Sequence, residues 1–222
     1  MARQHRLRQY AVTGSGYVKR FPLVIRIWLL SLVACAAAVA VSFAEVDVPV
    51  ARHFWKFGRH LSPLGSAFGA TVILALESVV VLGLIFARLT RGHLSRLGET
   101  LAIACLASIC AYGINDQVLK PFFGVQIPVA VLHGARHAFF AMRFAEGSFP
   151  SGHMVLAGAF AGVFMRLYRA SIWPLTALLV IAAALLVVGG WHFVSDVIAG
   201  AFLGVSAGML AGEGWIAHSY AR

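Results

Sequence analysis

The sequence predicts an all-α fold, a polytopic membrane bundle of about six transmembrane helices. Of its 222 residues, 60% are hydrophobic and only 12% are charged, and the mean hydropathy is +0.85. A water-soluble domain of this length could not bury so much apolar surface, whereas a helix that spans a bilayer needs roughly 20 apolar residues. The chain has room for six such helices, at about 27–44, 66–87, 98–118, 152–168, 173–189 and 193–215.

The first predicted span follows a basic tail, residues 1–26, and no small-residue cleavage site is evident, so we expect a retained anchor. Residues 27–222 are expected to form one six-helix membrane domain, because no internal repeat or long linker divides them. The second span carries Glu77, an intramembrane carboxylate that needs a partner or a wet cavity, and the sequence names no partner for it. The three cysteines lie inside spans and predict core packing rather than disulfides.

The basic residues orient the helices. Twelve of the eighteen lysines and arginines fall on one side of the membrane, together with both chain ends. Such an excess marks the cytoplasmic side, so the connections at about 45–65, 119–150 and 189–192 are expected on the outer face. A bacterial inner membrane, with a periplasmic outer face, is the favoured location. Because topology accounts for the net charge of +10, we expect no nucleic-acid partner.

Two polar stretches are predicted to meet at that outer face. Pro150–His153 reads PSGH, in which Ser151 is a preferred helix N-cap. A helix start attracts anions, since its free N–H groups and the positive end of its dipole point the same way. His153 in the first turn could donate to such an anion or give a proton to its leaving group.

The second stretch is WHFVSD, in which His192 and Asp196 lie four residues apart and so share one face of a helix. The carboxylate can keep one imidazole nitrogen protonated and leave the other as a nucleophile or base. The 39 residues from His153 to His192 suit one helix, a turn and a helix back. Each stretch alone could be an ordinary helix end or interfacial cluster, but the two together indicate a phosphoryl or similar anion site.

These residues resemble the integral membrane branch of the type 2 phosphatidic acid phosphatase and haloperoxidase-like superfamily, over roughly residues 20–216. Its signature reads KxxxxxxRP, then PSGH, then SRxxxxxHxxxD. Lys120 begins the first block here, Pro150–His153 is the second, and His192 to Asp196 ends the third.

The resemblance implies a phosphohistidine mechanism that needs no metal or other cofactor. His192 would attack phosphorus, Asp196 would orient it, and His153 would protonate the leaving alkoxide. The phosphoryl oxygens would be held by Lys120, Ser151 and the backbone of Gly152.

The arginines of the signature are absent from this chain. Ile127 precedes the proline of the first block, Val125 follows Gly124 where some members have another arginine, and the Ser-Arg pair of the third block falls on Leu185 and Leu186. One arginine on a transferring phosphoryl group can be worth about 10³-fold in rate.

Three explanations stay open. Arg136, His137 and Arg143 of the outer loop could replace the missing cations. Alternatively, the substrate could be a phosphodiester with less charge, as in the related sphingomyelin-synthase-like transferases. Finally, the site could bind a lipid without turnover.

The sequence therefore predicts a phosphoric ester hydrolase or phosphotransferase that acts on a lipid phosphate at the periplasmic face. The alternatives are a lipid phosphodiester head-group transferase and a non-catalytic lipid-binding protein.

Overall fold

The computed structural model describes residues 25–67, 69–141 and 147–221, and every regular element in these ranges is a helix. Within them, five helices are long and apolar enough to cross a membrane, and a shorter sixth is also apolar. The five are Ile25–Gly58, Ala70–Arg91, Arg96–Leu132, Arg169–Val188 and Val194–His218, and the sixth is Gly152–Leu167. The predicted all-α bundle of about six membrane helices is confirmed, and the chain is an integral membrane protein.

The chain divides into two compact units, residues 1–37 and 38–222. The described part of the first unit, from residue 25, is helical. The basic tail predicted for 1–26 lies almost entirely outside the described residues and stays a prediction. The second unit contains every helix from α2 to α9.

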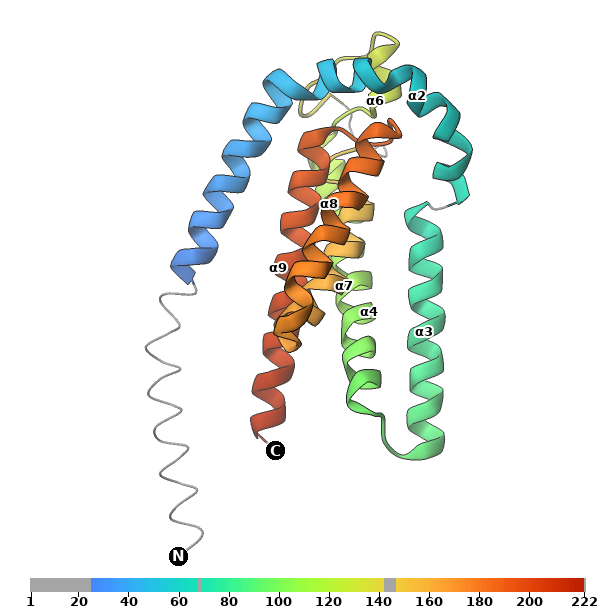
Figure 1. Ribbon diagram of the computed structural model, residues 1–222, viewed down its shortest axis with the longest axis vertical. Coiled ribbons are helices and arrows are strands. Elements are labelled where there is room, and N and C mark those ends of the chain that lie inside the picture. The colour runs from blue at the N-terminus through green and yellow to red at the C-terminus, as the bar shows by residue number, and fades with distance from the viewer. Residues whose placement is uncertain (1–24, 68, 142–146, 222) are drawn as a thin grey trace, which may run out of the picture. The chain divides into compact units, whose positions relative to one another are not determined.

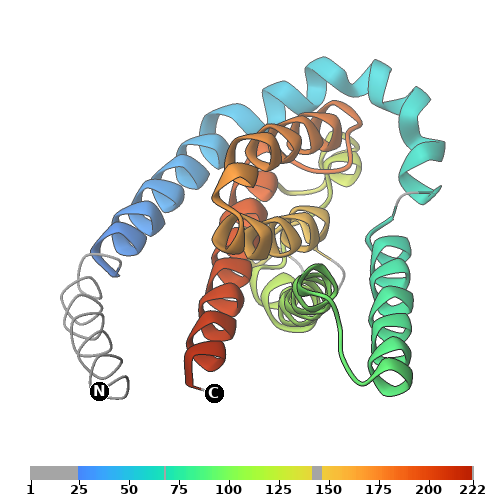
Figure 2. The same cartoon turned by 60° about the horizontal axis from the view of Figure 1, so that its bottom comes forward.

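Two helices, α7 (Gly152–Leu167) and α9 (Val194–Ala221), form the centre of this unit. They pack against each other along their length, and α7 also contacts α4 (Arg96–Ile114) (Figures 1 and 2). Glycines make the close approach of α7 and α9 possible. A Cβ atom on Gly204 of α9 would lie 2.5 Å from the carbonyl oxygen of Val155 on α7. Small residues of this kind let the backbones of membrane helices touch.

The order of the helices places two helix starts at one end of the bundle. In chain order, α8 (Ile172–Val188) follows α7, precedes α9 and runs in the opposite direction. Both α7 and α9 therefore begin at the upper end in Figure 1. At the same end, α4 passes through the π-turn η2 (Asn115–Leu119) into the short helix α5 (Lys120–Phe123). The connections from α3 (Ala70–Arg91) to α4 and from α7 to α8 lie at the opposite end.

A polar link joins α3, α4 and α7. The buried Glu77 side chain accepts a hydrogen bond from Ser108 Oγ at 2.8 Å, and this hydroxyl also lies 3.0 Å from the carbonyl oxygen of Leu156. A serine hydroxyl carries one proton, so it serves only one of these acceptors at a time. The partner that the sequence left unnamed for Glu77 is therefore Ser108.

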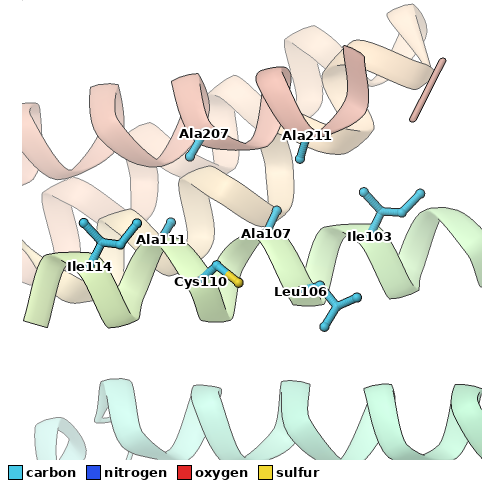
Figure 3. A pocket seen from close by; sticks show the side chains of 8 residues that line it. All are labelled: Ile103, Leu106, Ala107, Cys110, Ala111, Ile114, Ala207 and Ala211. Carbon is cyan, nitrogen blue, oxygen red and sulfur yellow. The ribbon is translucent and has the colours of Figure 1, made fainter. Parts of the chain in front are cut away.

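An apolar groove of about 390 Å³ lies between α4 and α9 (Figure 3). Its walls are the side chains of Ile103, Leu106, Ala107, Cys110, Ala111, Ile114, Ala207 and Ala211. Ala207 lies eleven residues beyond Asp196 on α9, which is about 16 Å along an α-helix. On α4 the groove extends from Ile103 to Ile114, the last residue before η2.

Candidate active site

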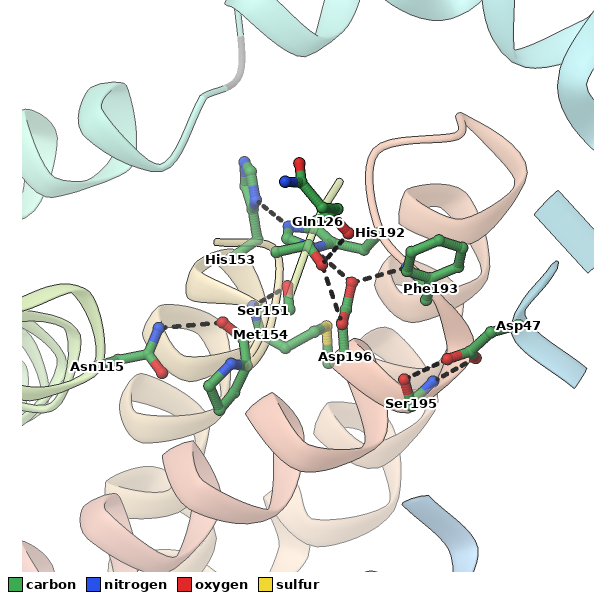
Figure 4. A network of polar contacts seen from close by, with 12 residues as sticks. Asp47, Asn115, Gln126, Ser151, His153, Met154, His192, Phe193, Ser195 and Asp196 are labelled. Carbon is green, nitrogen blue, oxygen red and sulfur yellow. Dashed lines mark hydrogen bonds and ion pairs between the residues drawn. The ribbon is translucent and has the colours of Figure 1, made fainter. Parts of the chain in front are cut away.

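The two histidines singled out in the sequence face each other at the start of α7 and α9 (Figure 4). Nδ1 of His153 lies 3.4 Å from Nε2 of His192, and Nδ1 of His192 lies 3.3 Å from Oδ2 of Asp196. An Asp196 carboxylate that accepts a hydrogen bond from Nδ1–H keeps the proton on that nitrogen and leaves a lone pair on Nε2 of His192. That lone pair points toward His153, which is the arrangement of a nucleophile beside a proton donor.

Asp196 is held in place by contacts with the N-terminal end of its own helix, α9. Its side chain is fully buried, and Oδ2 accepts a 2.8 Å hydrogen bond from the backbone N–H of Phe193. Phe193 directly precedes α9 and Asp196 is the third residue of that helix, so this bond is one half of a capping box. Ser148 Oγ lies 3.4 Å from Oδ1 of Asp196 and 3.1 Å from the carbonyl oxygen of Gln126.

The start of α7 is tied to the start of α9. Ser151 is the N-cap of α7, and its Oγ accepts a hydrogen bond from the backbone N–H of Met154 at 3.4 Å. The Ser151 N–H donates to the main-chain oxygen of Asp196 at 3.1 Å. On the other side, Asn115 Nδ2 donates to the carbonyl oxygen of Pro150 at 3.2 Å. These bonds fix both helix starts to each other and to η2, which follows α4.

Lys120 lies beside the first residue of α7. A Cβ atom on Gly152 would be 3.6 Å from Nζ of Lys120 and only 2.9 Å from the ring of Tyr112, so a side chain at Gly152 would fill this space. Asp116 pairs with the lysine at 2.9 Å. Of the two residues that precede Lys120 by about one turn, Asp116 orients the lysine, whereas Asn115 bonds Pro150 instead.

The family follows from a comparison with known proteins. The PAP2 superfamily model matches residues 100–213, just over half of the chain. This chain belongs to the PAP2 superfamily. The match contains Lys120, the PSGH stretch and the pair His192 and Asp196, as the motifs predict.

A solved PAP2 structure has a similar fold. It is the crystal structure of the first transmembrane PAP2 type phosphatidylglycerolphosphate phosphatase from Bacillus subtilis, which superposes with a TM-score of 0.54 at 19% sequence identity. The similarity covers 87% of this chain and 96% of the other. No curated protein matches the sequence. At this identity, the likeness shows that the two chains share the membrane PAP2 fold.

Apolar side chains occupy the positions where the PAP2 signature has arginine. Val125 is fully buried in a cluster with Phe149 and Ala199, and Leu186 is buried against Met154 and Val197. Ile127 is 41% exposed. Hydrophobic packing therefore replaces cations at two of these three positions.

The loop cations proposed as replacements differ in their surroundings. Arg136 is exposed, and its side chain forms no hydrogen bond or ion pair with other residues in the described ranges. Arg143 lies outside the described residues. His137 is nearly buried, its Nε2 lies 3.5 Å from Oδ2 of Asp47, and its ring stacks on Phe43. The roles of Arg136 and Arg143 in substrate binding stay predictions.

Sequence reasoning missed Asp47, a buried carboxylate behind the candidate nucleophile. Oδ1 accepts a 2.9 Å hydrogen bond from the N–H of Ser195, and Oδ2 accepts another from Ser195 Oγ. The two residues are 148 positions apart, so no local pattern connects them. The only signal was a pair of acidic residues, Glu45 and Asp47, within the otherwise apolar stretch AEVDVPV.

In the part of the chain that the structure describes, no group of three or more His, Cys, Asp or Glu side chains is placed so that it could hold a metal ion.

Proposed function

We propose that this PAP2 member is an integral membrane lipid phosphatase or phosphotransferase that cleaves a lipid phosphate ester through a phosphohistidine. The observation that carries the proposal is the row of three side chains, with Nε2 of His192 facing His153 and Nδ1 facing Asp196. A general acid, a nucleophile and an orienting carboxylate are the groups that such a reaction needs.

The proposed first step transfers the phosphoryl group to His192. Nε2 forms a bond to phosphorus while the ester P–O bond breaks, and His153 gives a proton to the leaving alkoxide. Attack and departure occur in line, so the substrate must enter between the two rings and end their 3.4 Å contact. Asp196 accepts a hydrogen bond from Nδ1–H of His192 and so stabilises the positive charge that develops on this ring.

The second step returns the site to its starting state. A water molecule attacks phosphorus and gives a proton to His153, the N–P bond breaks, and phosphate leaves. In a transferase, an acceptor hydroxyl takes the place of this water. Lys120, Ser151 and the Gly152 backbone are proposed to hold the phosphoryl oxygens, with Arg136 and Arg143 as additional cations.

The proposed location is a bacterial inner membrane, with both chain ends in the cytoplasm and the site in the periplasm. The distribution of basic residues supports this orientation. The expected partners are the lipid phosphate substrate and the surrounding membrane lipids.

A second candidate function is transfer of a lipid phosphodiester head group. Buried Val125 and Leu186 favour it, because a phosphodiester carries one negative charge and depends less on arginine than a phosphomonoester dianion does. A non-catalytic lipid-binding protein is the remaining alternative.

The test is an assay of the purified protein in detergent. We expect phosphate release from a lipid phosphomonoester, such as phosphatidic acid or phosphatidylglycerolphosphate, to fall at least about 10³-fold in His192→Ala, because the nucleophile is lost. His93→Ala is the matched control, since His93 is exposed in the turn between α3 and α4 at the opposite end of the bundle.

The alternatives give different results in the same assay. Head-group exchange between phospholipid and an acceptor, without free phosphate, would identify the transferase. Lipid binding without turnover of either substrate class would contradict both enzyme functions.

A further inference from the structure

The carboxylate of Asp47 accepts hydrogen bonds from the first turn of α9, although Asp47 is not part of that helix. It lies where the π-turn η1 (Ser42–Val46) meets α2 (Asp47–Ala67), and it is 1% exposed. Both of its oxygens are turned toward Ser195, one to the backbone N–H and one to the hydroxyl (Figure 4). Ser195 is the residue before Asp196, so Asp47 acts on the helix turn that carries the carboxylate proposed to orient the nucleophile.

Helix starts need such partners, because their first N–H groups have no acceptor within the helix. In α9, two carboxylates divide this work. Asp196 accepts the N–H of Phe193, and Asp47 accepts the N–H of Ser195. Since Asp47 serves Ser195, Oδ2 of Asp196 can stay in contact with both the Phe193 N–H and Nδ1 of His192.

The other side of Asp47 is also occupied. Nε2 of His137 lies 3.5 Å from Oδ2 of Asp47, and the His137 ring lies with its centroid 4.5 Å from that of Phe193. Phe193 is the residue between His192 and α9. The turn from His192 to Asp196 is therefore fixed by one hydrogen-bonded carboxylate and one packed ring, both from distant parts of the chain.

We propose that Asp47 is a positioning residue for the phosphohistidine reaction. Its two bonds to Ser195 hold the first turn of α9 so that Nε2 of His192 faces His153 while Nδ1 faces Asp196. Asp47 acts through Ser195, since its oxygens bond this residue rather than either histidine of the site. The inference rests on the proposed function for its catalytic part.

The test compares Asp47→Ala with Asp47→Asn. Alanine removes both bonds, whereas asparagine keeps an oxygen for the Ser195 N–H and an amide that can donate to Ser195 Oγ. We expect Asp47→Ala to speed hydrogen exchange of the Ser195 amide at least about 10-fold, since that amide loses its acceptor. We also expect kcat for phosphate release to fall about 10- to 100-fold with KM changed less than about 2-fold, because the effect is on reacting geometry.

Asp47→Asn is expected to stay within about 3-fold of the wild type in kcat, since its hydrogen bonds remain. Glu45→Ala is the matched control, because Glu45 is an exposed acidic residue on η1, two positions away. It should change neither exchange nor kcat. If Asp47→Ala does not fold, Ser195→Ala removes only the hydroxyl bond and should give a smaller loss of kcat in the same direction.

The two measurements separate the failure of this inference from the failure of the proposed function. Unchanged Ser195 exchange in Asp47→Ala, or an equal loss of kcat in Asp47→Asn and Asp47→Ala, overturns the positioning role in an active enzyme. A wild-type protein that releases no phosphate instead refutes the function and the catalytic part of the inference. In that case, the exchange data still decide whether Asp47 holds the turn.

Discussion

The two halves of the candidate site are built in different ways. The helical half consists of His153, His192 and Asp196, which stand at the starts of α7 and α9. The proposed cation half consists of Lys120 from α5, with Arg136 and Arg143 of the sequence proposed as additional cations. In the helical half, Asp196 is fully buried and both rings lie within 3.5 Å of a polar partner. In the cation half, Arg136 is exposed and Lys120 forms an ion pair with Asp116.

This difference shows which side chains of the site are positioned by the packing of helix backbones. The relative position of the histidines depends on contact between two helix backbones, which cannot change without moving a helix. The position of Lys120 depends on side-chain contacts, an ion pair with Asp116 and the ring of Tyr112, whose centroid lies 5.9 Å from Nζ. We therefore expect substitutions that move the helices to cost more activity than substitutions that remove single cations.

Among the substitutions that compare the two halves, the largest effect is expected when a methyl group separates α7 from α9. Gly204→Ala places a Cβ 2.5 Å from the carbonyl oxygen of Val155, and no rotamer change can relieve a contact with backbone. A shift of about 1 Å at reacting groups can cost 10²-fold, so we expect a loss of about that size in phosphate release. The thermal midpoint in detergent should also fall.

Helix propensity predicts the opposite change in stability, because alanine is better than glycine in a helix by about 1 kcal/mol. Gly214→Ala isolates this term, since a Cβ at exposed Gly214 of the same helix meets nothing within 4 Å. It should keep full activity and a thermal midpoint at or above that of the wild type. Equal behaviour of the two variants would show that the close packing of α7 and α9 does not set the site.

A smaller effect is expected for the lysine of the cation half. Lys120→Met keeps the apolar stem and removes the charge beside Gly152. We expect kcat/KM for a lipid phosphomonoester to fall about 10- to 30-fold, because the lysine stabilises the charge that the phosphoryl oxygens carry in the transition state. Lys56→Met, at an exposed position of α2, is the control. A loss as large as that in Gly204→Ala would remove the proposed difference between the halves.

The sequence predicted the helical half better than the contacts that support it, for a physical reason. His192 and Asp196 share a helix face through local spacing, and PSGH marks a helix start wherever it occurs. The supporting contacts depend on tertiary packing. Asp47 reaches Ser195 across 148 positions and Asn115 reaches Pro150 across 35. Such pairs leave no local pattern, as the Ser108 partner of Glu77 also illustrates.

The sequence showed that arginine is absent at the apolar positions of the signature, but it did not predict how the residues there pack. Val125 and Leu186 each join a hydrophobic cluster next to the site. A hydropathy pattern does not distinguish such residues from those that face lipid. The sequence could therefore say that cations are missing there, and only the fold says that other side chains fill the space.

The smallest effects are expected from the loop arginines, and they decide whether the cation half extends beyond Lys120. Arg136→Ala and Arg143→Ala should each lower kcat/KM about tenfold if these residues bind the phosphoryl group. For Arg136, which is exposed, solvent screens the charge and limits its contribution. Arg52→Ala, at an exposed position of α2, is the matched control for a change in surface charge. Because screening grows with ionic strength, the difference between wild type and Arg136→Ala should shrink from low to high salt. Activities within about twofold of the control at low salt would contradict the replacement of the missing arginines by loop cations, and would leave the less charged phosphodiester as the favoured substrate.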